Sequence, residues 1–225
     1  MRRLLVILAI LPVSFLAKAQ DPARFSFEIN VFLKYDKDSP PPQGCILFVG
    51  SSTIRMWKSL VPDFPDYCVI NRGFGGSEMS DLNYYFKDIV APYRPQIVVV
   101  YEGDNDLADG KTPETVLSDF KTFLGQMSRL PGVPVFYLSA KPSPSRWKLR
   151  DSYEKLNGLI MDYSRGKNDL YFVDMFKPML GENGRPKPEL FVADSLHMSP
   201  KGYDLWRHTL DPVLKKYYDK NKTGH

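Results

Sequence analysis

Histidine and cysteine, the side chains that most often bind metals or carry protons in enzymes, are scarce in this sequence. Its 225 residues include three histidines (His197, His208 and His225) and two cysteines (Cys45 and Cys68). No His-Glu-x-x-His segment and no Cys-x-x-Cys pair occurs, and these are spacings that zinc sites use. We therefore expect neither a metal nor another cofactor, and any histidine-dependent catalysis rests on one of three residues.

The two cysteines fall in or beside apolar runs that predict buried strands, where unpaired cysteine is common. A disulfide between them is possible in an oxidising compartment, but neighbouring parallel strands seldom offer the required geometry. We expect Cys45 and Cys68 to be buried and unpaired, with a disulfide as the alternative.

Long hydrophobic runs are absent after the first 19 residues, so the sequence predicts no later membrane-spanning helix. The N-terminus has two arginines, an apolar stretch over residues 4–16 and the small-x-small pattern Ala17-Lys18-Ala19. This order is typical of a secretory signal peptide. We predict a signal peptide over residues 1–19 and a secreted or periplasmic protein, with an uncleaved membrane anchor as the alternative.

A large excess of charge of one sign is also absent. The chain has 30 basic and 26 acidic residues; residues 1–19 hold three of the basic ones, which leaves 27 basic and 26 acidic residues after cleavage. A nearly neutral chain has no general attraction for nucleic acid. We expect no nucleic-acid partner, no stable membrane insertion after cleavage, and a solvated loop at the basic residues 141–150.

What the sequence does contain is an alternation of apolar runs and amphipathic stretches. The runs predict strands at residues 45–49, 67–70, 96–101, 134–138 and 170–173, and the amphipathic stretches predict helices at residues 25–37, 81–89, 113–129, 147–164 and 200–217. Continuous apolar strands followed by helices predict a parallel sheet covered on both faces. We expect one α/β domain over residues 45–225, a three-layer α/β/α sandwich with a five-stranded parallel sheet. A helix and a Pro-rich linker over residues 20–44 should pack on it.

Polar or glycine-rich segments follow the first three predicted strands, and another comes after the fifth. Ser51 and Ser52 follow the first strand, residues 71–80 the second, residues 101–107 the third, and residues 192–200 come after the fifth strand and a loop. Ligands of open α/β sheets bind outside the carboxyl ends of the strands. We therefore expect these four segments to share one edge of the sheet.

Three of these segments supply groups that could assist a serine nucleophile. His197 lies three residues after Asp194, so the carboxylate could accept the Nδ1 proton and leave Nε2 facing a serine hydroxyl. Gly73, Gly75 and Gly76 allow a close approach of the backbone to a ligand, and Asn105 carries an amide donor, so these residues are candidates for stabilising an oxyanion. An ordinary glycine turn and an Asx-turn are the structural alternatives.

The four segments together resemble the blocks of the SGNH hydrolases, also called the GDSL esterase/lipase family. They read Gly50-Ser51-Ser52, Asn71 to Gly76, Gly103-Asp104-Asn105-Asp106 and Asp194 to His197, in the order of the family's blocks. The resemblance implies a flavodoxin-like arrangement of the sheet and a serine hydrolase acting on carboxylic esters.

Carried over block by block, the resemblance implies that Ser52 is the nucleophile and His197 the general base, oriented by Asp194. Gly76 and Asn105 would form the oxyanion hole with the backbone N–H of Ser52. The aspartate that precedes the serine in the family is Ser51 here, which leaves open which of the two serines attacks.

Other functional classes fit less well. Residues 75–79 lack the final glycine of a G-x-S-x-G elbow, and residues 104–110 place Ala108 where a calcium loop needs a ligand. A non-catalytic carbohydrate-binding relative is a further alternative. For the substrate we expect a small-acyl, acetyl-type ester on a small molecule or polysaccharide, with an arylesterase or lysophospholipase as the alternative. Arg72, Arg146 and Trp147 are candidates for substrate contacts.

Overall fold

The computed structural model describes residues 21–222, and the segment predicted to be a signal peptide lies outside the described residues. Five strands form one parallel sheet: β1 (Ile46–Gly50), β2 (Val69–Gly73), β3 (Ile97–Tyr101), β4 (Val135–Leu138) and β5 (Leu170–Val173). Their order is β2-β1-β3-β4-β5, the flavodoxin-like order. The predicted fold class is therefore confirmed.

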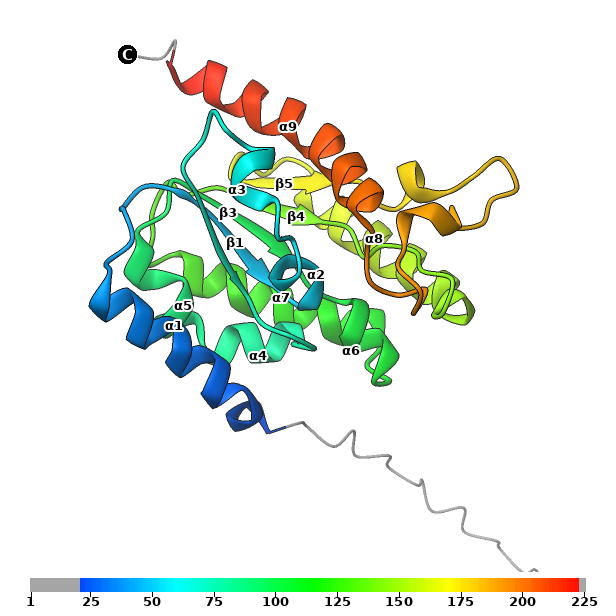
Figure 1. The fold of residues 1–225 in the computed structure, drawn as a ribbon, viewed down its shortest axis with the longest axis horizontal. Coiled ribbons are helices and arrows are strands. Elements are labelled where there is room, and N and C mark those ends of the chain that lie inside the picture. Colours follow the sequence, from blue (N-terminus) through cyan, green and yellow to red (C-terminus); the bar gives the residue numbers. More distant parts are fainter. Residues whose placement is uncertain (1–20, 223–225) are drawn as a thin grey trace, which may run out of the picture.

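Helices cover both faces of the sheet (Figure 1). The helices are α1 (Ser26–Asp38), α2 (Ser52–Arg55), α3 (Leu60–Asp63), α4 (Met79–Tyr84), α5 (Phe86–Ile89), α6 (Asp104–Ala108), α7 (Pro113–Met127), α8 (Arg150–Ser164) and α9 (Pro200–Lys222). Short 3₁₀ turns lie at Pro22–Phe25, Ala91–Tyr93, Trp147–Leu149, Lys177–Met179 and Pro188–Leu190. In the described part of the chain, none of the helices combines the length and the apolar character that crossing a bilayer requires.

The side chains of β1 alternate between two hydrophobic cores, as the pleat of a strand requires. Leu47 and Val49 join the core beneath α1, α4, α5, α7 and α8, whereas Ile46 and Phe48 join the core beneath α9. Both faces of the strand are fully buried, which explains why its sequence is continuously apolar instead of alternating.

The two cysteines form a disulfide, so the prediction that they are unpaired is wrong. Cys45 and Cys68 each precede a strand by one residue, and the register that pairs Ile46 with Val69 sets their Cα atoms 4.8 Å apart. This separation lies within the usual disulfide range. Cys68 is also exposed, although its carbonyl accepts a hydrogen bond from the backbone N–H of Ile46 at 2.8 Å.

Helix α1 packs on the domain through one face only. Ile29 is buried, and the Arg72 guanidinium at the end of β2 binds Asp36 near the end of the helix. The apolar stripe of Phe27, Val31 and Tyr35 is exposed, with 79% of Phe27 accessible to solvent. The helical periodicity at residues 25–37 is thus real, but the stripe with the largest side chains faces outward.

Candidate active site

The serine turn begins where β1 runs closest to β3. Gly50 has φ +132°, and a Cβ atom there would collide with the carbonyl oxygen of Tyr101. Only glycine fits such an approach without strain. The chain then turns outward, so that Ser51 is 2% exposed and Ser52 begins α2 with a partly accessible side chain.

Ser52, His197 and Asp194 form one hydrogen-bonded chain. Nε2 of His197 lies 3.1 Å from Oγ of Ser52, and Nδ1 of His197 lies 2.6 Å from Oδ2 of Asp194. The second oxygen of Asp194 accepts the backbone N–H groups of Leu196 and His197 at 2.8 and 2.9 Å. The aspartate thereby fixes both the imidazole and the loop that carries it.

The hydrogen bond from His197 holds the pKa of Asp194 down to about 2, with further lowering by the two backbone N–H groups. Asp194 is therefore ionised at neutral pH and can accept a hydrogen bond from Nδ1–H. The proton is thus held on Nδ1, and Nε2 is free to accept a proton from the Ser52 hydroxyl. His208, by contrast, lies exposed on α9 and its ring contacts the carbonyl of Asp204.

The glycine segment lies beside this serine turn. The backbone N–H of Phe74 donates to the carbonyl of Gly50 at 2.9 Å, which ties the end of β2 to the end of β1. Gly76 has φ +79° and an open space where a Cβ would be. The left-handed conformation therefore favours glycine here, and the space beside it is free for a ligand.

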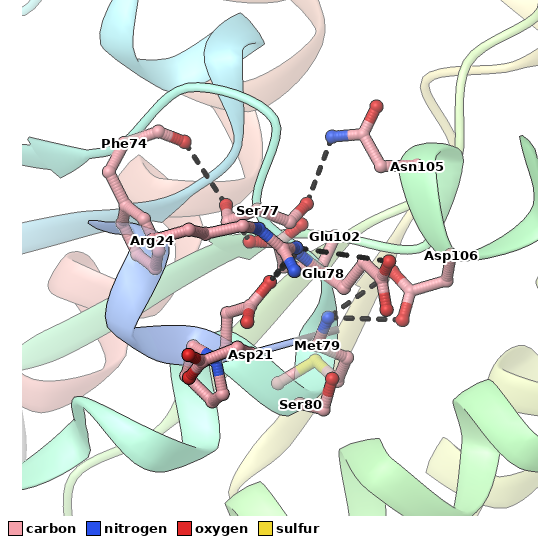
Figure 2. Close-up of polar contacts among 12 residues, drawn as sticks. Asp21, Arg24, Phe74, Ser77, Glu78, Met79, Ser80, Glu102, Asn105 and Asp106 are labelled. Atoms are coloured by element: carbon pink, nitrogen blue, oxygen red, sulfur yellow. Dashed lines mark hydrogen bonds and ion pairs between the residues drawn. The ribbon is translucent and has the colours of Figure 1, made fainter. Parts of the chain in front are cut away.

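Asn105 joins the same region from the segment after β3. Its Nδ2 donates to the carbonyl of Ser77 at 2.9 Å, as Figure 2 shows. Its Oδ1 accepts from Nη1 of Arg146 at 3.0 Å. These two bonds set the orientation of the amide, and the second hydrogen of Nδ2 is left to donate elsewhere.

Arg146 belongs to a buried ionic cluster that the sequence did not reveal. Asp104 accepts from Arg146 at 2.7 Å, from Lys141 at 2.9 Å and from the Tyr153 hydroxyl at 2.8 Å. Burial alone would raise the pKa of Asp104, but Lys141 and Arg146 outweigh it and hold that pKa well below its usual range. The carboxylate is thus a fixed anion that anchors Arg146 against Asn105.

Lys141 corrects the expectation of a solvated basic loop. Its side chain is 1% exposed and is paired with Asp104. A signal was present in the sequence, since Lys141 comes shortly after β4, at the carboxyl edge where the other site residues lie. Only Asp104 on the neighbouring strand end makes its burial favourable, because a buried charge needs a partner.

The three residues considered for substrate contacts have different surroundings. Arg72 is bound to Asp36 and to the Tyr93 hydroxyl, and Arg146 to Asp104 and Asn105. Trp147 lies on the segment whose Ser145 N–H donates to the carbonyl of Ser195, inside the loop between Asp194 and His197. Of the three, Trp147 is the one whose side chain has no hydrogen bond among the described residues.

Residues 49–205 match the model of the GDSL-like lipase/acylhydrolase family. None of the curated proteins matches the chain. Among solved structures, a candidate acylhydrolase from Bacteroides fragilis is 21% identical with a TM-score of 0.73, covering 84% of this chain and 96% of its own. A GDSL-like lipase from Bacteroides thetaiotaomicron is 22% identical, with a TM-score of 0.68, covering 88% and 98%. The acetylxylan esterase Axe2 from Geobacillus stearothermophilus is 14% identical, with a TM-score of 0.63, covering 75% and 93%. At these identities the likeness to solved structures establishes the fold.

Proposed function

Since the chain belongs to the GDSL-like lipase/acylhydrolase family, we propose that it is a serine esterase that hydrolyses small-acyl esters of carbohydrates. The observation that carries the proposal is the continuous contact from Asp194 through His197 to Ser52. A serine, a base and an orienting carboxylate in this order are the parts of a nucleophilic acyl transfer.

In the proposed first half-reaction, Oγ of Ser52 attacks the carbonyl carbon of the ester while Nε2 of His197 takes the hydroxyl proton. The bond to the alcohol then breaks, and His197 returns that proton to the departing oxygen. In the second half-reaction His197 takes a proton from water as the water oxygen attacks the acyl carbon. The bond from that carbon to Oγ of Ser52 then breaks, and His197 returns the proton to Oγ, which releases the acid and restores the enzyme. Asp194 stays ionised throughout and keeps Nε2 directed at the reacting oxygen.

The negative charge that develops on the carbonyl oxygen needs fixed donors. We assign this role to the backbone N–H groups of Ser52 and Gly76 and to the free Nδ2 hydrogen of Asn105. The bond from Arg146 to Oδ1 of Asn105 supports the assignment, because a cation on the oxygen side keeps the amide from rotating and makes its N–H a stronger donor.

The openness of the site supports a small acyl group on a bulky alcohol. The side chains of His197 and Asp194 are 26% and 47% exposed. Three surface pockets of the described residues, of about 230, 330 and 370 Å³, are lined by neither Ser52 nor His197. An exposed site suits a small acyl group, such as acetyl, on an oligosaccharide or polysaccharide that remains outside. The fold neighbour Axe2 acts on acetyl-xylooligosaccharides.

Export supports the same substrate class, since polysaccharides are met outside the cytoplasm. The N-terminal residues 1–19 have the pattern of a signal peptide, and the Cys45–Cys68 disulfide suits an oxidising compartment. We therefore propose that the protein is secreted or periplasmic. We also propose that its binding partners are ester substrates and not nucleic acids.

The exposed stripe of Phe27, Val31 and Tyr35 on α1 favours one alternative, a lysophospholipase or related lipid esterase. Exposed apolar side chains that line one helix face suit contact with a lipid surface.

A chain-length series of p-nitrophenyl esters, followed by acetylated xylo-oligosaccharides, tests the proposal. We expect acetate to have the highest kcat/KM, acetate release from the oligosaccharides, and neither activity in Ser52→Ala. A preference for acyl chains of eight or more carbons that depends on Phe27 and Val31 would support the lipid esterase instead.

A further inference from the structure

Glu102 is a buried acid that the catalytic steps do not use. It lies between β3 and α6 and is 0% exposed. Its Oε1 lies 2.6 Å from the hydroxyl oxygen of Ser77, and its Oε2 has no hydrogen-bond partner among the described residues. An ionised carboxylate with one oxygen unpaired in the interior would be costly. Its protonation state therefore needs a structural account.

The number of hydrogen atoms available around the Ser77 hydroxyl indicates the protonation state of Glu102. The Ser77 hydroxyl contacts two oxygens, Oε1 of Glu102 at 2.6 Å and the carbonyl of Phe74 at 3.1 Å. Figure 2 shows the contact with Phe74. A hydroxyl has one hydrogen, and a carbonyl oxygen has none to give. Both contacts are hydrogen bonds only when Glu102 carries a proton, so that Glu102 donates to Ser77 and Ser77 donates to Phe74.

The surrounding charges favour the same protonation state. The carboxylates of Glu78, Asp81 and Asp106, from the start of α4 and from α6, act on Glu102, and the cations beside them are already paired. Lys111 binds Glu78, Asp106 and Asp119 at 2.9 to 3.0 Å, and Arg24 binds Asp81 at 2.8 Å. From β4, the Tyr137 hydroxyl donates to the backbone carbonyl of Glu102 and not to its carboxyl group. Burial first, and then the negative charge of Asp106, raise the pKa of Glu102 well above its usual range.

We propose that Glu102 is a positioning residue of the oxyanion hole, which as a neutral carboxylic acid fixes the segment from Phe74 to Ser77. Ser77 follows Gly76 directly, and its carbonyl accepts from the amide of Asn105. The bond from Glu102 to the Ser77 side chain therefore fixes the segment on which two of the three proposed oxyanion donors, Gly76 and Asn105, depend. This inference rests on the proposed esterase function for its kinetic consequence, but not for the protonation of Glu102.

The protonation has a thermodynamic signature that does not depend on activity. In the unfolded chain a glutamate has a pKa of about 4.3, so at higher pH folding must take up one proton at Glu102. A raised native pKa gives stability that is fully present below the unfolded pKa and is lost as pH rises toward the native one. Glu102→Gln removes this proton uptake and keeps a donor for Ser77.

Urea unfolding at several pH values measures that signature. The folding constant of Glu102→Gln divided by that of the wild type should rise with pH above the unfolded pKa of about 4.3, by up to about tenfold per pH unit, until the raised native pKa of Glu102 is reached. The matched control is Glu114→Gln, which replaces an exposed glutamate whose pKa is lowered by Lys155, and its ratio should stay flat over this range. A flat ratio for Glu102→Gln would overturn the proposal.

Kinetics on a p-nitrophenyl ester test the positioning role. Glu102→Leu and Ser77→Ala, which each remove the side-chain link, should lower kcat roughly fivefold to tenfold with little change in KM, the value of about one hydrogen bond. Glu102→Gln should recover most of the kcat that Glu102→Leu loses. Folded variants that retain the wild-type kcat without the link would overturn the positioning role. A wild-type enzyme that hydrolyses no ester would instead contradict the proposed function, and the unfolding ratio would still decide whether Glu102 is protonated.

Discussion

The Ser52 hydroxyl lies 3.1 Å from Nε2 of His197, whereas Ser51, the residue before it, is 2% exposed and points into the protein. The two serines are adjacent in sequence but differ in the environment that a nucleophile needs, an accessible oxygen beside a base. The backbone conformation accounts for this difference, because Ser51 is still extended whereas Ser52 is the first residue of α2.

The first prediction concerns pH. His197 must be neutral to accept the serine proton, so kcat/KM should fall on the acid side as the imidazole becomes protonated. Asp194 does not contribute to this acid limb, because its pKa is held down to about 2 by the hydrogen bond from His197. A pH profile of kcat/KM measures the limb.

Asp194→Asn is the matching variant. It should lower kcat strongly at every pH. A neutral amide accepts the hydrogen bond from Nδ1–H more weakly than a carboxylate does, and the imidazole loses its preferred tautomer. An Asp194→Asn enzyme with near wild-type kcat, or an acid limb that persists unchanged in the residual activity of a His197 variant, would contradict the assigned roles.

The second prediction concerns Asn105. If its amide donates to the oxyanion, Asn105→Ala should lower kcat by ~10²–10³-fold, or about 3–4 kcal/mol, with little change in KM. If Asn105 only closes the turn by its bond to Ser77, the variant should lose thermal stability and keep its kcat. Measuring kcat and the melting temperature on the same preparation separates the two outcomes.

Arg146 gives a third prediction. Arg146→Leu removes the bond to Oδ1 of Asn105 and leaves Asp104 with Lys141 and Tyr153. We expect kcat to fall roughly tenfold, since a bond to a charged group contributes about 1.5–3 kcal/mol and part of it acts through the amide. Arg150→Leu is the control, because its guanidinium pairs with the exposed Glu154. An equal decrease of kcat in the two variants would contradict a specific role of Arg146 in orienting Asn105.

The disulfide gives a fourth prediction. Cys45 and Cys68 are separated by 23 positions. In the chain-entropy model, closing a loop of this size lowers the entropy of the unfolded chain and so raises its free energy by about 3 kcal/mol. Reduction, or Cys45→Ala with Cys68→Ala, should lower the free energy of unfolding by an amount of this order. The bond lies at the opposite end of β1 from Ser52, so kcat should stay unchanged well below the melting temperature. A large loss of kcat in the folded variant would be evidence against this separation.

The sequence predicted the centre of the sheet well because β1, β3 and β4 are buried on both faces and therefore read as apolar runs, as Ile46 to Val49 do. It also led to the polar residues at the strand ends, since parallel strands bring their carboxyl ends to one edge. It failed where a residue's environment depends on tertiary register. Whether Cys45 meets Cys68 depends on how β1 and β2 align, and whether Lys141 is solvated depends on Asp104 from the neighbouring strand end.

Glu102 shows the same limit most clearly. In the sequence it is one more acid in a polar turn, and nothing local distinguishes it from Asp104 or Asp106. The three carboxyl groups differ only in their partners, since Asp104 binds two cations, Asp106 binds Lys111 and two backbone N–H groups, and Glu102 has Ser77 alone.

The central claim is that Ser52 forms the acyl-enzyme. Mass spectrometry of the protein after treatment with a fluorophosphonate, which phosphonylates activated serines, tests it most directly. We predict one adduct per chain, located on Ser52, with loss of esterase activity in proportion to labelling, no adduct in Ser52→Ala and normal labelling in Ser51→Ala. An adduct on Ser51, or ester hydrolysis that persists after Ser52 is replaced, would contradict the account.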